Sequence, residues 1–500
     1  MTEFKEAASP NTRRANGGHN GRSDKAKEEK SSRAKDHSKA VTIFRSGNFH
    51  FIWSFLTGAS NPVSQTWTLF NLSVNIGLSL MMIDAIFTAP WLYPARELSF
   101  TRTGYVSHQS ADILIREPDT SRLPITLFYR LEHRTSSPSY DGIIREVEWQ
   151  SAEERVTHLS DETDYTAVFR VQNLLPDSSY EYMLTNNHSG YFYTAPLPGN
   201  ISEKREKAYT FFHSSCLIPR FPYSLSHPLR IRGLTYVAEW ISRLQPYFML
   251  FLGDFIYIDV PFRQGSDKEA YRREYRQVYA SPDWHNASAR LPWIHVLDDH
   301  EIANDWHSNT TGLYPAATDP WQSYHVSVNP PRVRPDETYF TFTQGPATFF
   351  LMDTRRYRSP DPYLDFSDPS KTMLGKLQFE DLISFLQTPA PQGVHWKFVI
   401  SSVPFTKNWR FGEEDVWGGF LAERRKILEA MWDASLDGNV GVVILSGDRH
   451  EFAATAFPPP KGEKWPLSAT VHEFSTSPLS MFYLPTRTYK QMDEEDICLK

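Results

Sequence analysis

The sequence predicts a mixed α/β domain that follows a small all-β domain and a membrane-spanning helix. Three observations predict this order: an apolar stretch at 67–89, short alternating segments between 99 and 195, and alternating strand and helix patterns from 209 onward. Of the 500 residues, 40% are hydrophobic and 14% are aromatic. The chain can therefore form a large core, and its length suits two or three domains.

Charge and cysteine content exclude two classes of protein. The formal net charge is −7, and no basic stripe occurs beyond the N-terminal region. This pattern argues against nucleic acid as the main partner. Cys216 and Cys498 are the only cysteines, so the chain has no disulfide framework.

The N-terminal region is basic and polar. The first 40 residues are rich in Lys, Arg, Ser, Asn and Gly and have no periodic apolar face, which predicts disorder. We therefore expect a disordered basic cytosolic tail over residues 1–62. The aromatic patch Phe44–Phe55 could instead lie on a membrane surface or form a second, weaker span.

The apolar stretch at 67–89 has about the 20-residue length that crosses a bilayer core. We place a transmembrane segment at 63–93. Asn71, Asn75 and Asp84 within it leave a buried helix of a soluble protein as the alternative. The late start and the length of the stretch argue against a cleavable signal peptide.

The distribution of basic residues predicts the orientation of this span. Lys and Arg are frequent before it and scarce just after it, which places the N-terminus in the cytosol. The rest of the chain would then be lumenal or extracellular, as in a single-pass membrane protein of the secretory pathway or cell surface. N-glycosylation sequons, as in a glycoprotein, begin at Asn187, Asn200, Asn286 and Asn309.

Residues 96–200 read as a small antiparallel β-sandwich. Short segments alternate apolar and polar residues between turns, as in sandwiches of the fibronectin III/Ig-like kind. Leu175-Pro176, followed by Tyr180 and Tyr182, resembles the corner of fibronectin type III folds. We interpret the domain as a spacer that packs on the domain after it, with an adhesive module as the alternative.

The pattern becomes α/β after the charged residues 201–208, in a domain predicted at 206–490. The expected elements are a strand Tyr209–Ser214, a helix Leu234–Leu244, a strand Tyr247–Phe251, a helix Lys268–Tyr279, a strand Trp293–Leu297, a hairpin turning at Gln344–Pro346, a helix Leu374–Leu386, a strand Trp396–Ser401, a helix Leu421–Trp432 and a strand Val440–Leu445. The chain ends without a further strand that we expect to close a second sheet, which suggests C-terminal truncation.

Four of these strands end in residues that could bind metal. They are Cys216; Asp254 with Tyr257; Asp298, Asp299 and His300; and Asp448 with His450. Taken singly, an Asp after a strand is commonly a helix cap, and Asp259 is interpreted as a loop-capping acid. Together, carboxylates, a phenol, a thiol and an imidazole at one sheet edge require positive charge, which metal ions supply. Asp and Tyr oxygens suit a hard, highly charged ion.

These motifs, in the order Ser-Cys, GDFIYID, DDHE, DTRRYR, LGKLQ and SGDRHE, resemble the PhoD-like branch (alkaline phosphatase D) of the metallophosphoesterases. The resemblance implies a four-layer α/β sandwich with two facing sheets, preceded by the β-sandwich. It also implies a site of ferric iron and calcium, with zinc or manganese as the alternative. Residues that match the iron-binding positions are Cys216, Asp254, Tyr257, Asp448 and His450, and Asp254 would bridge to the second ion.

The remaining site residues follow from the same resemblance. Asp298, Asp299 and Asp305 are candidates for the second ion, and His300 would lie beside the phosphate. Arg355 is the candidate that orients the phosphate, because a planar guanidinium can bind two phosphate oxygens. A surface salt bridge is its alternative role, and Arg449 could bind the phosphate instead.

The expected function is metal-dependent hydrolysis of a phosphoester by a phosphomonoesterase or phosphodiesterase. Metal-bound hydroxide would attack phosphorus directly, and His300 could protonate the leaving group. Ser215 has no neighbouring base in its motif and is interpreted as a backbone cap, so no covalent intermediate is expected. The alternatives are phospholipase-type activity on lipid or anchor-linked phosphate, and a non-catalytic membrane-tethered binding protein.

Overall fold

The computed structural model describes residues 51–62, 64–132, 148–205, 208–361, 364–437, 440–491 and 495–499. Its internal contacts divide the chain into two units, residues 1–84 and 85–500. Most of the predicted disordered tail lies outside the described residues. Residues 51–57 are helical, although the prediction placed them in that tail.

The helix α2 spans Gln65–Ile83 and continues as one turn of π-helix at Asp84–Thr88. It begins at Ser64, whose Oγ accepts a hydrogen bond from the Trp67 N–H at 3.2 Å. In the described part of the chain, Gln65–Thr88 is the one helix long and apolar enough to cross a membrane. Of an apolar 18-residue stretch of this helix, 6% is buried. The Asn75 amide donates to the Asn71 carbonyl at 2.8 Å, so this polar side chain is satisfied within the helix.

The region after α2 is a sandwich of two antiparallel sheets. Among the described residues the first sheet has the order β1-β2-β5 and the second β4-β3-β6-β7. Their bounds are β1 Phe100–Val106, β2 Ala111–Arg116, β3 Ile125–Leu131, β4 Gln150–Val156, β5 Thr166–Val171, β6 Ser179–Leu184 and β7 Ser189–Tyr193. The inward-facing side chains form one core, which includes Ile113, Leu127 and Phe169. At the predicted corner, the Tyr180 hydroxyl accepts a hydrogen bond from the Leu175 N–H at 2.9 Å.

The α/β region contains two further sheets. The parallel sheet β10-β9-β8-β17 consists of β8 Phe212–Leu217, β9 Met249–Phe251, β10 Trp293–His295 and β17 Pro478–Ser480. The mixed sheet β11-β12-β13-β14-β16-β15-β18 consists of β11 Phe340–Gln344, β12 Ala347–Leu351, β13 Trp396–Ile400, β14 Gly441–Ser446, β15 Ala453–Phe457, β16 Val471–Ser475 and β18 Ile497–Cys498. In the second sheet β12, β13, β14 and β16 are parallel neighbours.

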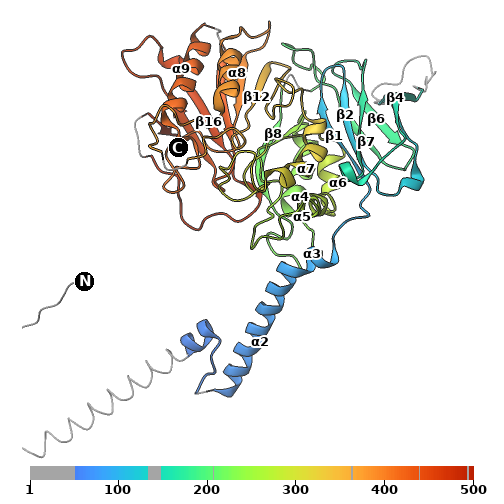
Figure 1. Cartoon of the computed structure of the whole chain (residues 1–500), viewed down its shortest axis with the longest axis vertical. Helices are drawn as coiled ribbons and strands as arrows, with labels where there is room; N and C mark the ends of the chain where they lie inside the picture. The colour runs from blue at the N-terminus through green and yellow to red at the C-terminus, as the bar shows by residue number, and fades with distance from the viewer. Residues whose placement is uncertain are drawn as a thin grey trace, which may run out of the picture. The chain divides into compact units, whose positions relative to one another are not determined.

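The two sheets pack through aromatic side chains, and helices cover their outer faces. Phe248 contacts Phe342 and Phe349 edge to face, with ring centroids 5.6 Å apart in each pair. The helices are α3 Ala89–Leu92, α4 Arg232–Leu244, α5 Lys268–Tyr279, α6 Trp284–Ser288, α7 Tyr314–Tyr324, α8 Gly375–Gln387 and α9 Leu421–Asp437. Helix α9 packs on β14 and β16, whereas α4 packs on β17, so helices lie on both sides of the paired sheets (Figure 1).

These elements confirm a mixed α/β chain with several sheets. Helix α5 has the predicted bounds, and the hairpin β11–β12 turns at Gly345, whose φ is +54°. The predicted strand at Tyr209–Ser214 is displaced: β8 starts at Phe212 and extends past Cys216. Ile497–Cys498, where no strand was predicted, pairs with β15.

Candidate metal centre

The predicted ligands lie at one edge of the sheets, where parallel strands end. Strand β8 carries Cys216, and Asp254, Asp298 and Asp448 follow β9, β10 and β14 within a few residues. Gly253 has φ +98°, and a Cβ there would lie 2.4 Å from the Asp298 Cβ. The glycine therefore allows the loop after β9 to pass against the loop after β10.

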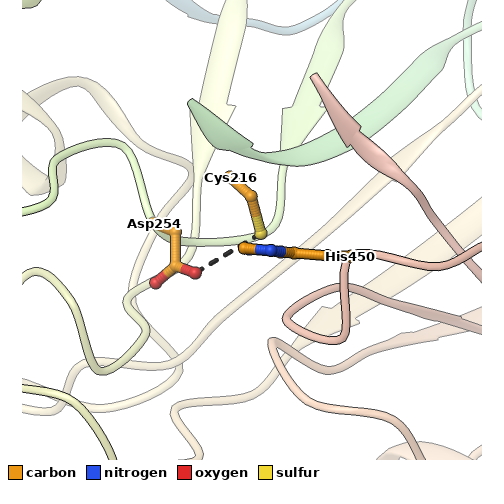
Figure 2. Close-up of side chains that lie close together, drawn as sticks. All are labelled: Cys216, Asp254 and His450. Atoms are coloured by element: carbon orange, nitrogen blue, oxygen red, sulfur yellow. Dashed lines mark hydrogen bonds between the residues drawn. The ribbon is translucent and has the colours of Figure 1, made fainter. Parts of the chain in front are cut away.

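Three side chains from three segments converge in Figure 2: Cys216, Asp254 and His450. Their potential ligand atoms all lie within 4.8 Å of one another. The Cys216 thiol donates to Asp254 Oδ2 at 3.3 Å. The Tyr257 hydroxyl donates to the same oxygen at 2.8 Å and lies 2.9 Å from His450 Nε2. The structure thus brings together four of the five residues predicted for iron in one hydrogen-bonded cluster.

A second cluster shares Asp254 with the first. Its potential ligand atoms, from Asp254, Asp298, Asp299 and Asp448, lie within 4.8 Å of one another. Asp298 Oδ2, Asp299 Oδ1 and Asp448 Oδ2 are buried and have no hydrogen-bond partner among the described residues. Buried carboxylate oxygens without a partner are costly, and cations would satisfy them. These donors therefore fit two ions that share Asp254.

The pKa shifts of the ligand residues also indicate a site for cations. Burial raises the pKa of Cys216, Asp254, Tyr257 and Asp448 well above their ordinary values. Burial also raises the pKa of Asp298 to about 6, although the nearby Arg355 opposes the shift. The protein alone therefore disfavours the anionic forms that bind metal, and added positive charge would reverse this.

His300 lies beside both clusters. Its Nδ1 is 2.6 Å from Asp259 Oδ1, and its ring packs against the Tyr257 ring at a tilt of 35°, with centroids 4.2 Å apart. Burial alone lowers the pKa of His300, but Asp299, Asp254 and Asp259 together raise it to about 11. Asp259, predicted to cap a loop, does accept the Asn304 N–H at 2.8 Å, and it also orients His300.

Arg355 is buried and already bound to carboxylates. Its Nε donates to Asp298 Oδ1 at 2.6 Å, and its two terminal nitrogens donate to Asp415 at 2.6 and 3.0 Å. The alternative of a surface salt bridge is wrong, because its side chain has no exposed area. Arg449 lies nearer the surface, where its guanidinium donates to the Phe411 carbonyl and sits 3.9 Å from Asp448.

Asp305 is the exposed member of the predicted set. It forms a third group with Asp299 and Asp415, again within 4.8 Å, and its N–H donates to Asp299 Oδ2 at 2.5 Å. Ser215 is buried, and its Oγ lies 2.9 Å from Cys216 Sγ. The hydroxyl thus contacts the thiol, a contact that its interpretation as a backbone cap did not include.

Five of the predicted ligands have left-handed backbone conformations. Values of φ are +58° at Cys216 and Asp254, +54° at Asp305, +73° at Asp448 and +55° at His450. Such conformations are unfavourable for residues with a Cβ, and they concentrate at functional sites. Four of the five, Cys216, Asp254, Asp448 and His450, belong to the two clusters that share Asp254.

Sequence reasoning missed three residues that hold the site together. Glu301, inside the DDHE motif, accepts hydrogen bonds from the N–H groups of Asp254, Phe255 and Asp298. Asp415 binds Arg355 and Arg358, and the Ser402 Oγ donates to Asp298 at 2.8 Å. Of the three, only Glu301 could have been found from the sequence, because it belongs to the DDHE motif at the end of a predicted strand.

Comparisons with known proteins found a relative among curated proteins. The chain aligns with alkaline phosphatase D of Bacillus subtilis (strain 168), with 25% identity over 327 residues. This alignment covers 55% of the chain and 52% of the relative, so the chain spans about half the length of that protein.

Solved structures show a similar fold. The structure of PhoD matches with a TM-score of 0.58 and 19% identity, covering 78% of each chain. The purple acid phosphatase PPD1 from yellow lupin matches with a TM-score of 0.50 and 12% identity, covering 78% of this chain and 67% of that one. The family model described as PhoD-like phosphatase matches residues 231–498, more than half of the chain. The chain therefore belongs to the PhoD-like phosphatase family.

Proposed function

We propose that this chain is a metal-dependent phosphoester hydrolase whose reaction takes place at the cluster around Asp254. The observation that carries the proposal is a set of buried oxygens of Asp298, Asp299 and Asp448 beside Asp254 that accept no hydrogen bond from the described residues. Arg355 and Arg449 lie 3.6 and 3.9 Å from the Asp299 and Asp448 oxygens, so the cations of the protein only partly compensate them. A binding protein without metal ions would have no need for such an arrangement, because each buried carboxylate oxygen without a hydrogen bond lowers the stability of the fold. Family membership supports the same reaction class.

Ferric iron and calcium are the ions we propose. Iron would be held by Cys216, Asp254, Tyr257, Asp448 and His450, and calcium by the carboxylates Asp298, Asp299 and Asp305 with Asp254 shared. A thiol, a phenol and an imidazole suit a transition metal, whereas an all-carboxylate group suits calcium. Zinc or manganese is the alternative. When bound, such ions lower the pKa of water and neutralise charge on phosphoryl oxygens.

The chain's own residues would bind the substrate and donate a proton to its leaving group. His300 holds a proton at Nδ1, shared with Asp259, and its Nε2 is left to donate to a leaving oxygen. Arg449 is the better candidate to contact phosphate, because the donors of Arg355 are used by Asp298 and Asp415. We assign Arg355 to positioning those carboxylates. Among the described residues the Ser215 hydroxyl is hydrogen-bonded to a thiol and to no base, which supports direct attack by water without a covalent intermediate.

We also propose that the fold is the four-layer metallophosphoesterase sandwich, that the preceding domain is of the fibronectin III/Ig-like kind, and that Gln65–Thr88 spans a membrane with the N-terminus in the cytosol. Asn187, Asn200 and Asn286 are exposed and suit a lumenal glycoprotein. The Asn309 side chain instead donates to the carbonyls of Arg356 and Arg358. A loss of mass on glycosidase treatment after expression in a eukaryotic host would support this orientation.

The reaction is tested on the purified full chain in detergent. Hydrolysis of p-nitrophenyl phosphate, its bis-ester and phospholipids would show whether monoesters, diesters or lipid and anchor-linked phosphates are preferred. Asp448→Asn removes one charge of the cluster and should abolish turnover, as should a chelator. Asp433→Asn is the matched control, because Asp433 lies on α9 in an ion pair with Lys464. If the metal-loaded chain hydrolysed none of these esters, the binding-protein alternative would hold.

A further inference from the structure

The loops around the candidate metal centre carry exposed apolar side chains. They leave the parallel sheet at the same edge as the ligands, after β8 and β17. We call five of these residues the rim: Phe221, Leu225, Phe482, Tyr483 and Leu484. All are exposed, Leu225 by 85% and Tyr483 by 77%. Side chains of this size and exposure in one place indicate a binding surface.

Contacts within the rim tie it to the site. The rings of Phe221 and Phe482 lie 6.4 Å apart, and the Ser480 hydroxyl donates to the Phe221 carbonyl at 2.6 Å. Phe482 also contacts the His450 ring at 4.9 Å. The loop after β8 and the loop after β17 therefore form one surface beside a proposed metal ligand.

The same edge of the sheet contacts the segment that follows the apolar helix. Tyr93 packs on His227, in the loop that contains Phe221 and Leu225, with ring centroids 5.7 Å apart. Phe87 packs on Phe262, three residues after Asp259, with ring centroids 6.0 Å apart. Two independent contacts therefore hold the end of the apolar helix against loops of the metal-binding edge.

Hydrogen bonds fix this segment further. Gln277 of α5 donates from its amide to the carbonyls of Ala89 and Tyr93, each at 3.0 Å. Residues 89–93 span at most about 18 Å even when fully extended. If Gln65–Thr88 spans the bilayer, the loop that carries His227 must lie close to the membrane surface.

The composition of the surface suits a lipid interface. Trp91 in α3 is 79% exposed directly after the apolar helix, at the position where aromatic residues anchor a span. Tyr483 is aromatic and amphipathic, and two exposed cations follow it in sequence: Lys490, and Arg487, which lies 3.5 Å from Glu451. Aromatic and leucine side chains beside cations are typical of surfaces that insert shallowly into the head-group region.

We propose that the rim docks on the bilayer that the apolar helix enters, so that the candidate metal centre opens toward the lipid head groups. This inference rests on the membrane span proposed above. It commits to a lipid surface rather than a protein partner, because chain continuity already brings this edge to the membrane. A phosphoester presented at the surface would then reach the site without leaving the bilayer.

Fluorescence quenching in lipid nanodiscs tests the docking. The full chain is assembled in nanodiscs of phosphatidylcholine and phosphatidylglycerol, with Cys498→Ser as background. Single variants Leu225→Cys and Tyr483→Cys carry an environment-sensitive maleimide fluorophore, and doxyl-labelled phosphatidylcholine is the quencher. We expect quenching of at least about twofold at both positions, because the rim would lie in the head-group region.

Two further labelled positions separate the possible failures. Leu377→Cys, exposed on α8, is the matched control and should remain unquenched. Leu78→Cys, exposed on α2, reports the span itself and should be quenched. Quenching at 78 without quenching at 225 and 483 would overturn the docking alone, whereas no quenching at 78 would overturn the span and the docking with it. Neither result depends on ester hydrolysis, which the assay above measures separately.

Discussion

At the scale of single residues, Tyr257 distinguishes an iron site from other metal sites. Its hydroxyl lies between Asp254 Oδ2 and His450 Nε2, at 2.8 and 2.9 Å. A tyrosinate bound to ferric iron absorbs visible light. We therefore expect the metal-loaded chain to be coloured and Tyr257→Phe to lose the visible band, as measured by absorption spectroscopy with elemental analysis.

The matched control for this substitution is Tyr339→Phe. The Tyr339 hydroxyl donates to Asp381 at 2.6 Å, outside the site, so the band should persist in this variant. A colourless wild-type chain that contains zinc or manganese would contradict the assignment of iron.

Glu301 positions two ligand-bearing loops at once. Its carboxylate accepts three backbone N–H groups, and burial raises its pKa to about 8. In Glu301→Gln an NH₂ group replaces one accepting oxygen and would face a donor. We expect metal affinity to fall about 10- to 100-fold, as when other residues that orient metal ligands are replaced, measured by metal titration.

The control for Glu301 is Glu274→Gln on α5. Burial raises the pKa of Glu274 to about 7, and its carboxylate bonds to Arg273 rather than to a ligand loop. An equal loss of metal affinity in both variants would show that Glu301 acts only through general stability.

The site could be predicted from sequence where a motif follows a strand. Asp254 and Asp448 follow apolar runs, and parallel strands bring such ends together. Asp415 could not be found in this way, because it lies in a loop, in the acidic run 413–415, with no strand before it. Its role comes from Arg355 and Arg358, whose partners depend on packing between distant segments.

At the scale of elements, β1 joins the sandwich to the α/β region. A Cβ at Gly104 would lie 2.3 Å from the Val328 carbonyl oxygen, in the 3₁₀ turn Val326–Val328. Gly104→Ala should therefore lower the free energy of unfolding by about 1–3 kcal/mol through overpacking. Chemical denaturation of the full chain in detergent measures the change.

Gly418→Ala is the control for this position, because its added Cβ would meet Lys407 at 3.5 Å, an ordinary contact distance. A loss in Gly104→Ala no larger than that in Gly418→Ala would mean that the close contact at Gly104 adds no cost.

Amphipathic helices and tight turns were predictable, but strand limits were less so. Helix α5 matches its predicted bounds because Asp267 caps it, accepting the Ala270 N–H at 2.9 Å. The strands β8, β9 and β10 were harder to delimit. Strands β9 and β10 lie in apolar runs without alternation, whereas β8 contains His213, Ser214 and Ser215. The ends of all three depend on hydrogen bonds to neighbouring strands rather than on local sequence.

At the scale of the whole molecule, a buried histidine pair makes stability depend on pH. His295 of β10 stacks on His325 with ring centroids 3.6 Å apart, and neither His295 nitrogen has a hydrogen-bond partner among the described residues. Burial, the neighbouring His325 and Arg102 hold the pKa of His295 well below 6.5. The unfolded chain thus binds a proton near pH 6.5 that the folded chain does not.

The free energy of unfolding should therefore fall as pH drops below about 6.5, by about 1.4 kcal/mol per pH unit for each such histidine. His295→Phe keeps the ring and removes one of these protons, so its dependence on pH should be shallower by that amount. Thermal or chemical unfolding of wild type and variant at several pH values measures the difference.

The exposed His158 provides the control for this slope, because His158→Phe removes an imidazole that is hydrated in both states. An unchanged slope in His295→Phe would show that the folded core accepts the proton by rearranging.

The left-handed backbone at the ligands affects how this protein can evolve. At Asp448, with φ +73°, and at His450, with φ +55°, glycine would relieve a conformational penalty of about 1 kcal/mol each. Selection for thermal stability alone would then favour variants that have lost their ligands. Keeping the site requires selection on its chemistry, and a lineage released from that selection should lose its ligands first at these turns.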